Sequence, residues 1–182
     1  MAPLLYTLPN LTIVDHPADS EHCGGTRAGY YYIFLHDTDT PTDGNGLDSL
    51  NFLSTQAGTK VSCTRYIPKK GPIYKLMPDS TVPWTNGATV LEDLPFNVPG
   101  VNEWSLTIEM EHSRHDVGRA SWPFIQVQLC AWQCAEWQGL YGELPILSHA
   151  RVQANRKDPR DFPWDIFYRE LDKRKRIGTR VY

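Results

Sequence analysis

The feature that most constrains this chain is an uninterrupted apolar run, YYYIFL, at residues 30–35. A run of this kind is typical of a strand buried on both faces, as in the parallel sheets of α/β proteins. It stops at His36, Asp37 and Thr38, so polar side chains begin where the strand ends. We therefore predict a buried central strand with chemically capable residues at its end.

Other periodic segments predict helices and further strands around this one. The predicted strands are residues 61–67, 73–77, 104–111 and 144–147, and the predicted helices are residues 47–56, 122–141 and 163–175. Pro68 and Gly71 separate the first two of these strands and favour a hairpin. In the second helix, an apolar stripe of Trp122, Ile125, Leu129, Cys130 and Trp132 is expected to face the core. The fold class is α/β: one domain with a central mixed sheet and helices on both faces.

Length and charge exclude several classes of protein. The 182 residues allow one sizeable core, and no apolar run approaches the roughly 18–20 residues that span a bilayer. Lys and Arg number 18 against 21 Asp and Glu, a net charge of −3, so nucleic acid is not an expected partner. No signal peptide is evident at the start of the chain, and the four cysteines are expected to be reduced.

Two histidines follow predicted strands directly. His36 ends the central run, and His149 follows the strand at residues 144–147. If the strand ends converge, a nearby aspartate would complete a His/His/carboxylate metal site with one open position, and Asp158 is the candidate. The alternative is that each histidine is an ordinary surface or hydrogen-bonded residue.

A third strand carries candidate acid–base residues. Residues 104–111 alternate with period two, so Trp104, Leu106, Ile108 and Met110 share one face, and Thr107, Glu109 and Glu111 share the other. Either Glu109 or Glu111 could act as a general base, whereas most strand glutamates are simply solvated.

Other reactive residue types give weaker signals. His112 and His115, with His22 and Cys23, could form a second metal site, but short histidine patterns are common by chance. A cysteine–histidine nucleophile at Cys63 lacks any signature of thiol activation. Three tryptophans and two cysteines at helical spacing are expected to be core residues. They are Trp122, Trp132, Trp137, Cys130 and Cys134.

Three segments together resemble the zinc-dependent N-acetylmuramoyl-L-alanine amidases, a family that includes T7-like lysozymes and peptidoglycan recognition proteins. They are residues 33–38 (IFLHDT), 105–109 (SLTIE) and 149–164, which contains RKDPR and FPW. The resemblance covers about residues 30–168. It implies that residues 30–182 form a zinc amidase catalytic domain without a separate wall-binding domain. Residues 1–29 mix Pro, Gly and Asp with short apolar patches, so we expect an irregular arm there with a short edge strand at 11–14.

The resemblance also implies site residues. His36, His149 and Asp158 would hold Zn²⁺, and Glu109 would be the general base and acid, with Glu111 as its rival. The implied function is hydrolysis of the amide between N-acetylmuramic acid and L-alanine in peptidoglycan. The alternatives are a non-catalytic peptidoglycan-binding protein and a zinc peptidase acting on another amide.

This chain departs from the family pattern in two places. The family has Lys-x-Asp-Pro-Gly where this chain has Lys157 directly before Asp158, so either Lys157 or Arg156 could stabilise the oxyanion. Where members often have Ser-x-His and Trp-His-x-Gly, this chain has SCT at residues 62–64 and WTNG at residues 84–87. Here Trp84, by stacking on a sugar ring, and Asn86 are expected to bind substrate.

The remaining expectations concern biological setting. A basic cluster at residues 169–180 could contact anionic wall polymers or the inner face of an outer membrane, or could simply be a solvated helix end. We expect the protein to be a monomer. We also expect it to be either a phage endolysin or a bacterial wall-lytic enzyme, with antimicrobial action. It would be made in the cytoplasm of the producing cell and would act on the wall after release.

Overall fold

The computed structural model describes residues 12–40, 46–87, 100–153 and 155–178. Its central strand, β3 (Tyr32–Asp37), is buried at every residue, which confirms the prediction from the apolar run. Two parallel strands flank it, β7 (Ser105–Met110) and β8 (Ile146–Ser148). The C-terminal end of β3, which contains His36, and the end of β8, which His149 follows, therefore lie at the same edge of the sheet.

Three further strands extend the sheet beyond β7. β4 (Arg65–Ile67) runs parallel to β7, β5 (Ile73–Lys75) pairs antiparallel with β4, and β1 (Ile13–Asp15) runs parallel to β5 at the edge. The order is β1-β5-β4-β7-β3-β8, a mixed six-stranded sheet. The expected α/β class and the hairpin are confirmed, although β4 and β5 are shorter than the apolar segments that predicted them.

The segment before β3 has more regular structure than expected. After β1, a short 3₁₀ helix (Ser20–His22) leads into β2 (Cys23–Thr26), which pairs antiparallel with β6 (Thr81–Pro83) in a separate two-stranded sheet. Residues 1–11 lie outside the described residues. The described part of the expected irregular arm therefore contributes one strand to each sheet.

Arg27 joins the two sheets. Its buried guanidinium donates hydrogen bonds to the backbone carbonyl oxygens of Asp79, Thr81, Asn102 and Ser105. Five N–H donors in a planar fork allow one side chain to satisfy several carbonyls at once. The start of β7 is thus tied to β6.

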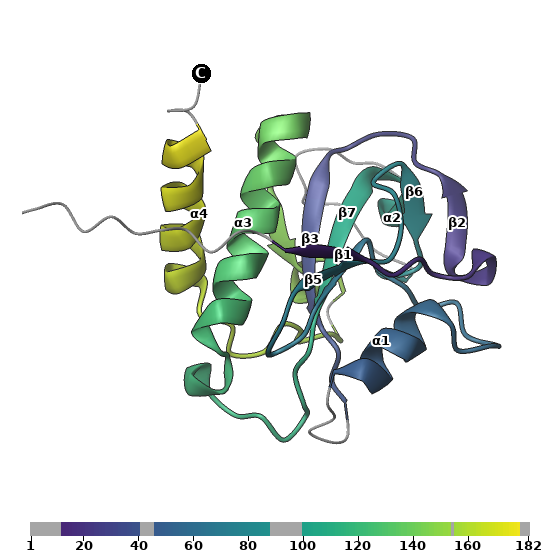
Figure 1. The fold of residues 1–182 in the computed structure, drawn as a ribbon, viewed down its shortest axis with the longest axis horizontal. Coiled ribbons are helices and arrows are strands. Elements are labelled where there is room, and N and C mark those ends of the chain that lie inside the picture. The colour runs from purple at the N-terminus through teal and green to yellow at the C-terminus, as the bar shows by residue number, and fades with distance from the viewer. Residues whose placement is uncertain (1–11, 41–45, 88–99, 154, 179–182) are drawn as a thin grey trace, which may run out of the picture.

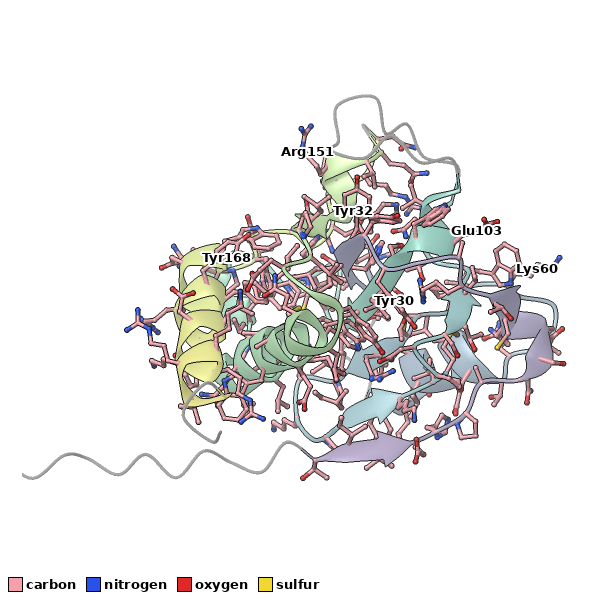
Figure 2. The ribbon with its side chains drawn as sticks, turned by 90° about the horizontal axis from the view of Figure 1, so that it is seen from above. Tyr30, Tyr32, Lys60, Glu103, Arg151 and Tyr168 are labelled. Atoms are coloured by element: carbon pink, nitrogen blue, oxygen red, sulfur yellow. The ribbon has the colours of Figure 1, made fainter. Side chains whose placement is uncertain are left out.

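One face of the sheet is covered by α3 (Phe124–Tyr141) and α4 (Trp164–Gly178), which pack against each other. Both helices lie to the same side of the strands in Figure 1, and Figure 2 shows the same layer edge-on, with Tyr168 on α4 and Lys60 on the opposite side of the molecule. The main core lies between this layer and the sheet. Its buried members include Trp132, Trp137, Phe167, Leu106 and Ile108.

The apolar stripe predicted for the long helix is partly wrong. Trp122 is buried but precedes α3, and Ile125 is 37% exposed. α3 is buried over most of its circumference because the sheet and α4 enclose it from two directions. Trp132, Trp137, Cys130 and Cys134 are all core residues as expected, and both cysteines are free.

The opposite face of the sheet carries α1 (Leu47–Ser54), a short helix α2 (Val101–Trp104) and the polar side chains described below. Leu50 and Leu53 of α1 pack on Tyr66 of β4. Trp104 was expected in the strand, but it closes α2, which begins after Gly100 in a left-handed conformation with φ of 72°. The helices therefore cover both faces, and the face with α1 is only partly covered.

The basic cluster on α4 is partly neutralised. Lys173 pairs with Glu170, Arg174 lies 3.9 Å from Glu136, and Lys175 pairs with Glu143. Residues 179–182 lie outside the described residues, so contact of this cluster with anionic polymers stays a prediction. Among the helices that the structure describes, none is long and apolar enough to cross a membrane.

Candidate metal centre and active-site cleft

The register of the parallel strands brings the predicted site residues together. His36 of β3 is the direct partner of Glu109 of β7, and residues paired in this way project from the same face of the sheet. Leu35 pairs with Ser148 on the other side, so His149, the first residue of the 3₁₀ helix His149–Arg151, follows at the level of His36. Residues far apart in the sequence thus become neighbours at one sheet edge.

Asp158 completes this group from the loop that follows. Its Oδ2 lies 3.1 Å from Nδ1 of His36 and 3.0 Å from Nδ1 of His149. The backbone carbonyl of Asp158 accepts a hydrogen bond from the Ala150 N–H, which holds the loop against the 3₁₀ helix His149–Arg151. Among the described residues, this is the one cluster of His, Cys, Asp or Glu with metal-binding geometry.

The chemistry and spacing of this donor set fit a divalent metal. Two imidazole nitrogens and a carboxylate oxygen are the ligands of many catalytic zinc sites. In a tetrahedral site with ligand distances of about 2.0–2.1 Å, neighbouring ligand atoms lie about 3.3 Å apart, close to the spacings seen here. Burial lowers the pKa of His36, which favours the neutral imidazole that a metal requires. The three residues can therefore hold a metal ion.

The cluster lies at the base of a cavity of about 700 Å³ on the sheet face that carries α1. Phe52 and Val61 supply apolar surface on one wall, while Arg156, Lys157 and Arg160 supply positive charge near the cluster. The cavity thus presents both apolar surface and positive charge beside the metal cluster. The Pro-, Gly- and Asn-rich composition of residues 82–100 also predicts a cleft wall, but residues 88–99 lie outside the described residues.

Glu109 faces the cavity beside the candidate ligands. Its side chain is nearly buried, with 9% of the residue exposed. Burial raises the pKa of Glu109 well above its ordinary value, and the negative charges of Asp158 and Asp37 raise it further, while Arg156 acts in the opposite direction. A carboxyl group whose pKa is raised and which is adjacent to a metal site has the properties of a general base and acid.

Glu111, the rival to Glu109, points elsewhere. Its Oε2 accepts a hydrogen bond of 2.9 Å from the Lys69 backbone N–H, and the same oxygen lies 2.9 Å from the position that a Cβ on Gly46 would take. Gly46 has φ of 77°, so both its conformation and its contact with Glu111 favour glycine. Glu111 therefore buttresses the start of α1 and does not line the cavity.

Both candidates for oxyanion stabilisation reach the cavity. Arg156 and Lys157 are exposed and line its wall next to Asp158. Arg156 is braced by Gln153, whose Oε1 lies 3.3 Å from its Nε, and its charge is the one that acts on Glu109. The choice between the two residues stays open.

The two predicted substrate-binding residues lie at different depths. Trp84 is 39% exposed and packs across Gly24 of β2, and it does not line the cavity. Asn86 is fully buried, and its Oδ1 lies 3.0 Å from Nε2 of His36. Their roles in binding substrate stay predictions.

Asp37 and Arg160 form a part of the site that the sequence reading missed. The buried carboxylate of Asp37 accepts a hydrogen bond of 2.8 Å from the Arg160 N–H, and burial raises the pKa of Asp37 to about 6. The Arg160 guanidinium contacts Asp39, at 2.7 Å. The one available signal was that Arg160 replaces the glycine expected after Pro159.

The weaker alternatives from the sequence have structural explanations. The His112 ring is buried and stacked on Trp122 at 4.1 Å, with its Nε2 3.0 Å from Ser121 Oγ. His22 is buried with its Nδ1 2.9 Å from the Val61 carbonyl oxygen. Burial raises the pKa of the Cys63 thiol well above its ordinary value, the reverse of what a nucleophile needs.

Comparison with known proteins agrees with this geometry. Residues 27–161 match the sequence profile of the Amidase_2 family, described as N-acetylmuramoyl-L-alanine amidase. No curated protein sequence matches the chain.

Several solved structures share the fold at low sequence identity. An AmpD structure superposes with a TM-score of 0.70 at 17% identity, covering 90% of this chain and 96% of AmpD. A mutant endolysin from Bacillus subtilis gives 0.67 at 17% identity, covering 88% and 99%. AmiD from E. coli, solved with the substrate anhydro-N-acetylmuramic acid-L-Ala-D-γ-Glu-L-Lys, gives 0.62 at 21% identity, covering 78% and 57%.

Proposed function

Because the chain belongs to the N-acetylmuramoyl-L-alanine amidase family, we propose that it hydrolyses the amide bond between N-acetylmuramic acid and L-alanine in peptidoglycan. The observation that carries the proposal is the placement of Glu109 in the same cavity as the metal-binding group of His36, His149 and Asp158. The muramyl peptide bound to AmiD supports the class of substrate.

We assign zinc as the metal on the basis of the two imidazole nitrogens and one carboxylate oxygen, with room for one further ligand. When bound, zinc would lower the pKa of a water molecule and polarise the substrate carbonyl. His36, His149 and Asp158 would hold it, and Asp158 would also offset part of its positive charge.

Glu109 supplies the proton transfers in this proposal. Its carboxylate takes a proton from the attacking water and later delivers it to the departing L-alanine nitrogen, which is a poor leaving group until protonated. Burial, together with the neighbouring carboxylates of Asp158 and Asp37, favours the proton-bearing form of Glu109, which suits the second step.

Positive charge on the cavity wall serves the developing oxyanion. Arg156 or Lys157 would place an N–H donor against the carbonyl oxygen as it gains negative charge, a role typically worth about 10²- to 10³-fold in rate. Both residues line the cavity together with Asp158, which supports either one in this role.

Digestion of purified cell walls tests the proposal. We expect loss of turbidity with release of new amino groups and no new reducing sugars, and abolition of both by a chelator. Binding to walls without clearing would favour a non-catalytic recognition protein, and cleavage of other amides alone would favour a zinc peptidase. The endolysin origin, antimicrobial action, monomeric state and action after release from the producing cell stay predictions.

A further inference from the structure

We propose that Asn86 is a positioning residue that keeps the imidazole hydrogen of His36 on Nε2 and so leaves Nδ1 bare to bind the metal. The inference rests on the proposed function only for the identity of the metal. It assigns Asn86 a role different from the substrate contact expected from the sequence.

A chain of buried hydrogen bonds carries the argument. Nε2 of His36 lies 3.0 Å from Oδ1 of Asn86, Nδ2 of Asn86 donates to Oγ of Ser105 at 3.1 Å, and Oγ of Ser105 donates to the Val101 carbonyl oxygen at 2.7 Å. Asn86 and Ser105 are fully buried, and His36 is 2% exposed. The Asn86 backbone N–H also donates to Oδ1 of Asn102 at 2.9 Å, which fixes the backbone of Asn86.

The direction of each hydrogen bond follows from the available donors and acceptors. The Val101 carbonyl can only accept, so the single hydroxyl hydrogen of Ser105 points to it. Ser105 Oγ must then accept from Asn86, which places the NH₂ group of the amide toward Ser105 and its oxygen toward His36. An amide oxygen can only accept, so His36 must carry a hydrogen on Nε2.

The consequence appears on the other side of the ring. A neutral imidazole with its hydrogen on Nε2 presents a lone pair at Nδ1, and that atom lies 3.1 Å from Oδ2 of Asp158. Two lone pairs facing each other at this distance repel, and a cation between them converts the repulsion into coordination. The buried chain of hydrogen bonds therefore orients Nδ1 of His36 and Oδ2 of Asp158 for metal binding before a metal is bound.

The two histidine ligands differ in this respect. Nε2 of His149 is buried without a hydrogen-bond partner among the described residues. Asn86 thus acts on one ligand alone, and the effect of removing it is expected to be confined to His36.

Zinc affinity of the 182-residue protein, measured by competition with a chelator, tests the inference. Loss of such a partner typically costs about 10- to 100-fold in metal affinity, and we expect that loss in Asn86→Ala. Asn86→Asp keeps an acceptor facing His36 and should bind zinc within about threefold of wild type. Ser105→Ala frees the amide to turn and should shift zinc affinity in the same direction as Asn86→Ala.

Gln126→Ala is the matched control, because Gln126 is also a fully buried amide, and its Nε2 donates to the carbonyl oxygens of Ile67 and Glu111. This variant should lose stability and keep wild-type zinc affinity. Wild-type affinity in Asn86→Ala, or a loss in Asn86→Asp as large as that in Asn86→Ala, would overturn the inference.

A second measurement does not depend on zinc or on wall hydrolysis. In metal-free wild-type protein with ¹⁵N-labelled histidine, the NMR spectrum should show His36 with hydrogen on Nε2 and a bare Nδ1, and Ser105→Ala should show a mixture of both tautomers. A wild-type His36 with its hydrogen on Nδ1 refutes the role of Asn86 even if the protein is an amidase. Failure to digest walls would instead count against the proposed function.

Discussion

Replacing Glu109 with glutamine should lower the activity but raise the stability of the metal-free protein. Glutamine keeps the shape of the side chain but cannot take up or deliver a proton. Turnover on peptidoglycan should fall about 10²-fold or more, the range expected for loss of a general acid and base. Zinc content should persist, because Glu109 is not among the three candidate ligands.

The stability of the metal-free protein should change with the opposite sign. Burial and the charges of Asp158 and Asp37 raise the pKa of Glu109 in the folded state, so above about pH 4.5 the unfolded chain releases a proton that the folded chain retains. The free energy of unfolding therefore declines by about 1.4 kcal/mol for each pH unit until the folded pKa is passed. The Glu109→Gln variant has no carboxyl group at this position and should not show this decline.

Urea unfolding of the metal-free proteins between pH 4.5 and pH 7 measures this contribution of Glu109 to the free energy of unfolding. The advantage of Glu109→Gln over wild type should grow with pH at about the slope given above. Glu111→Gln is the control for activity, since its amide oxygen can still accept from the Lys69 N–H, and it should keep most of the activity. Parallel pH profiles for wild type and Glu109→Gln, or full activity in Glu109→Gln with loss in Glu111→Gln, would refute the reasoning.

Three further predictions test neighbouring parts of the site. His36→Ala should lose both bound zinc, measured by elemental analysis, and wall hydrolysis; retention of both would remove His36 from the metal site. Either Arg156→Ala or Lys157→Ala, but not both equally, should lower turnover on muramyl peptide by about 10²- to 10³-fold, and wild-type rates in both would place the oxyanion donor elsewhere. Burial lowers the pKa of His112 from 6.5 to about 4, so wild type should lose about 3 kcal/mol of unfolding free energy as pH falls through that window. His112→Phe keeps a ring against Trp122 and should lose correspondingly less in urea unfolding; an equal acid loss in both proteins would contradict this assignment.

The sequence predicted those features that depend on local pattern. An uninterrupted apolar run indicates burial on both faces, so the run at residues 30–35 was sufficient to predict β3 and the polar residues at its end. Strand alternation also placed Leu106, Ile108 and Met110 on one face, and all three pack into the main core. Glu109 then had to lie on the other face, where the cavity is.

Features that depend on strand order and distant contacts could not be predicted. Nothing local indicates that β7 lies beside β3, which is what puts Glu109 next to His36. Asn86 lies 50 residues from His36, and Arg27 reaches carbonyls more than 50 residues away, so neither shows a spacing signal. Glu111 shares the strand alternation of Glu109, and only the loop carrying Lys69 separates their roles.

The convergence of His36, His149 and Asp158 from three separate segments has a consequence for the lifetime of the protein. In the unfolded chain His36 is separated from Asp158 by 122 positions, so a metal held by all three ligands binds the folded state almost exclusively. At a free concentration one hundred times its dissociation constant, such a ligand adds about 2.7 kcal/mol to the free energy of unfolding. Metal supply would then set how often the chain opens to proteases as well as how fast it turns over substrate, so a starved cell would lose the enzyme together with its activity.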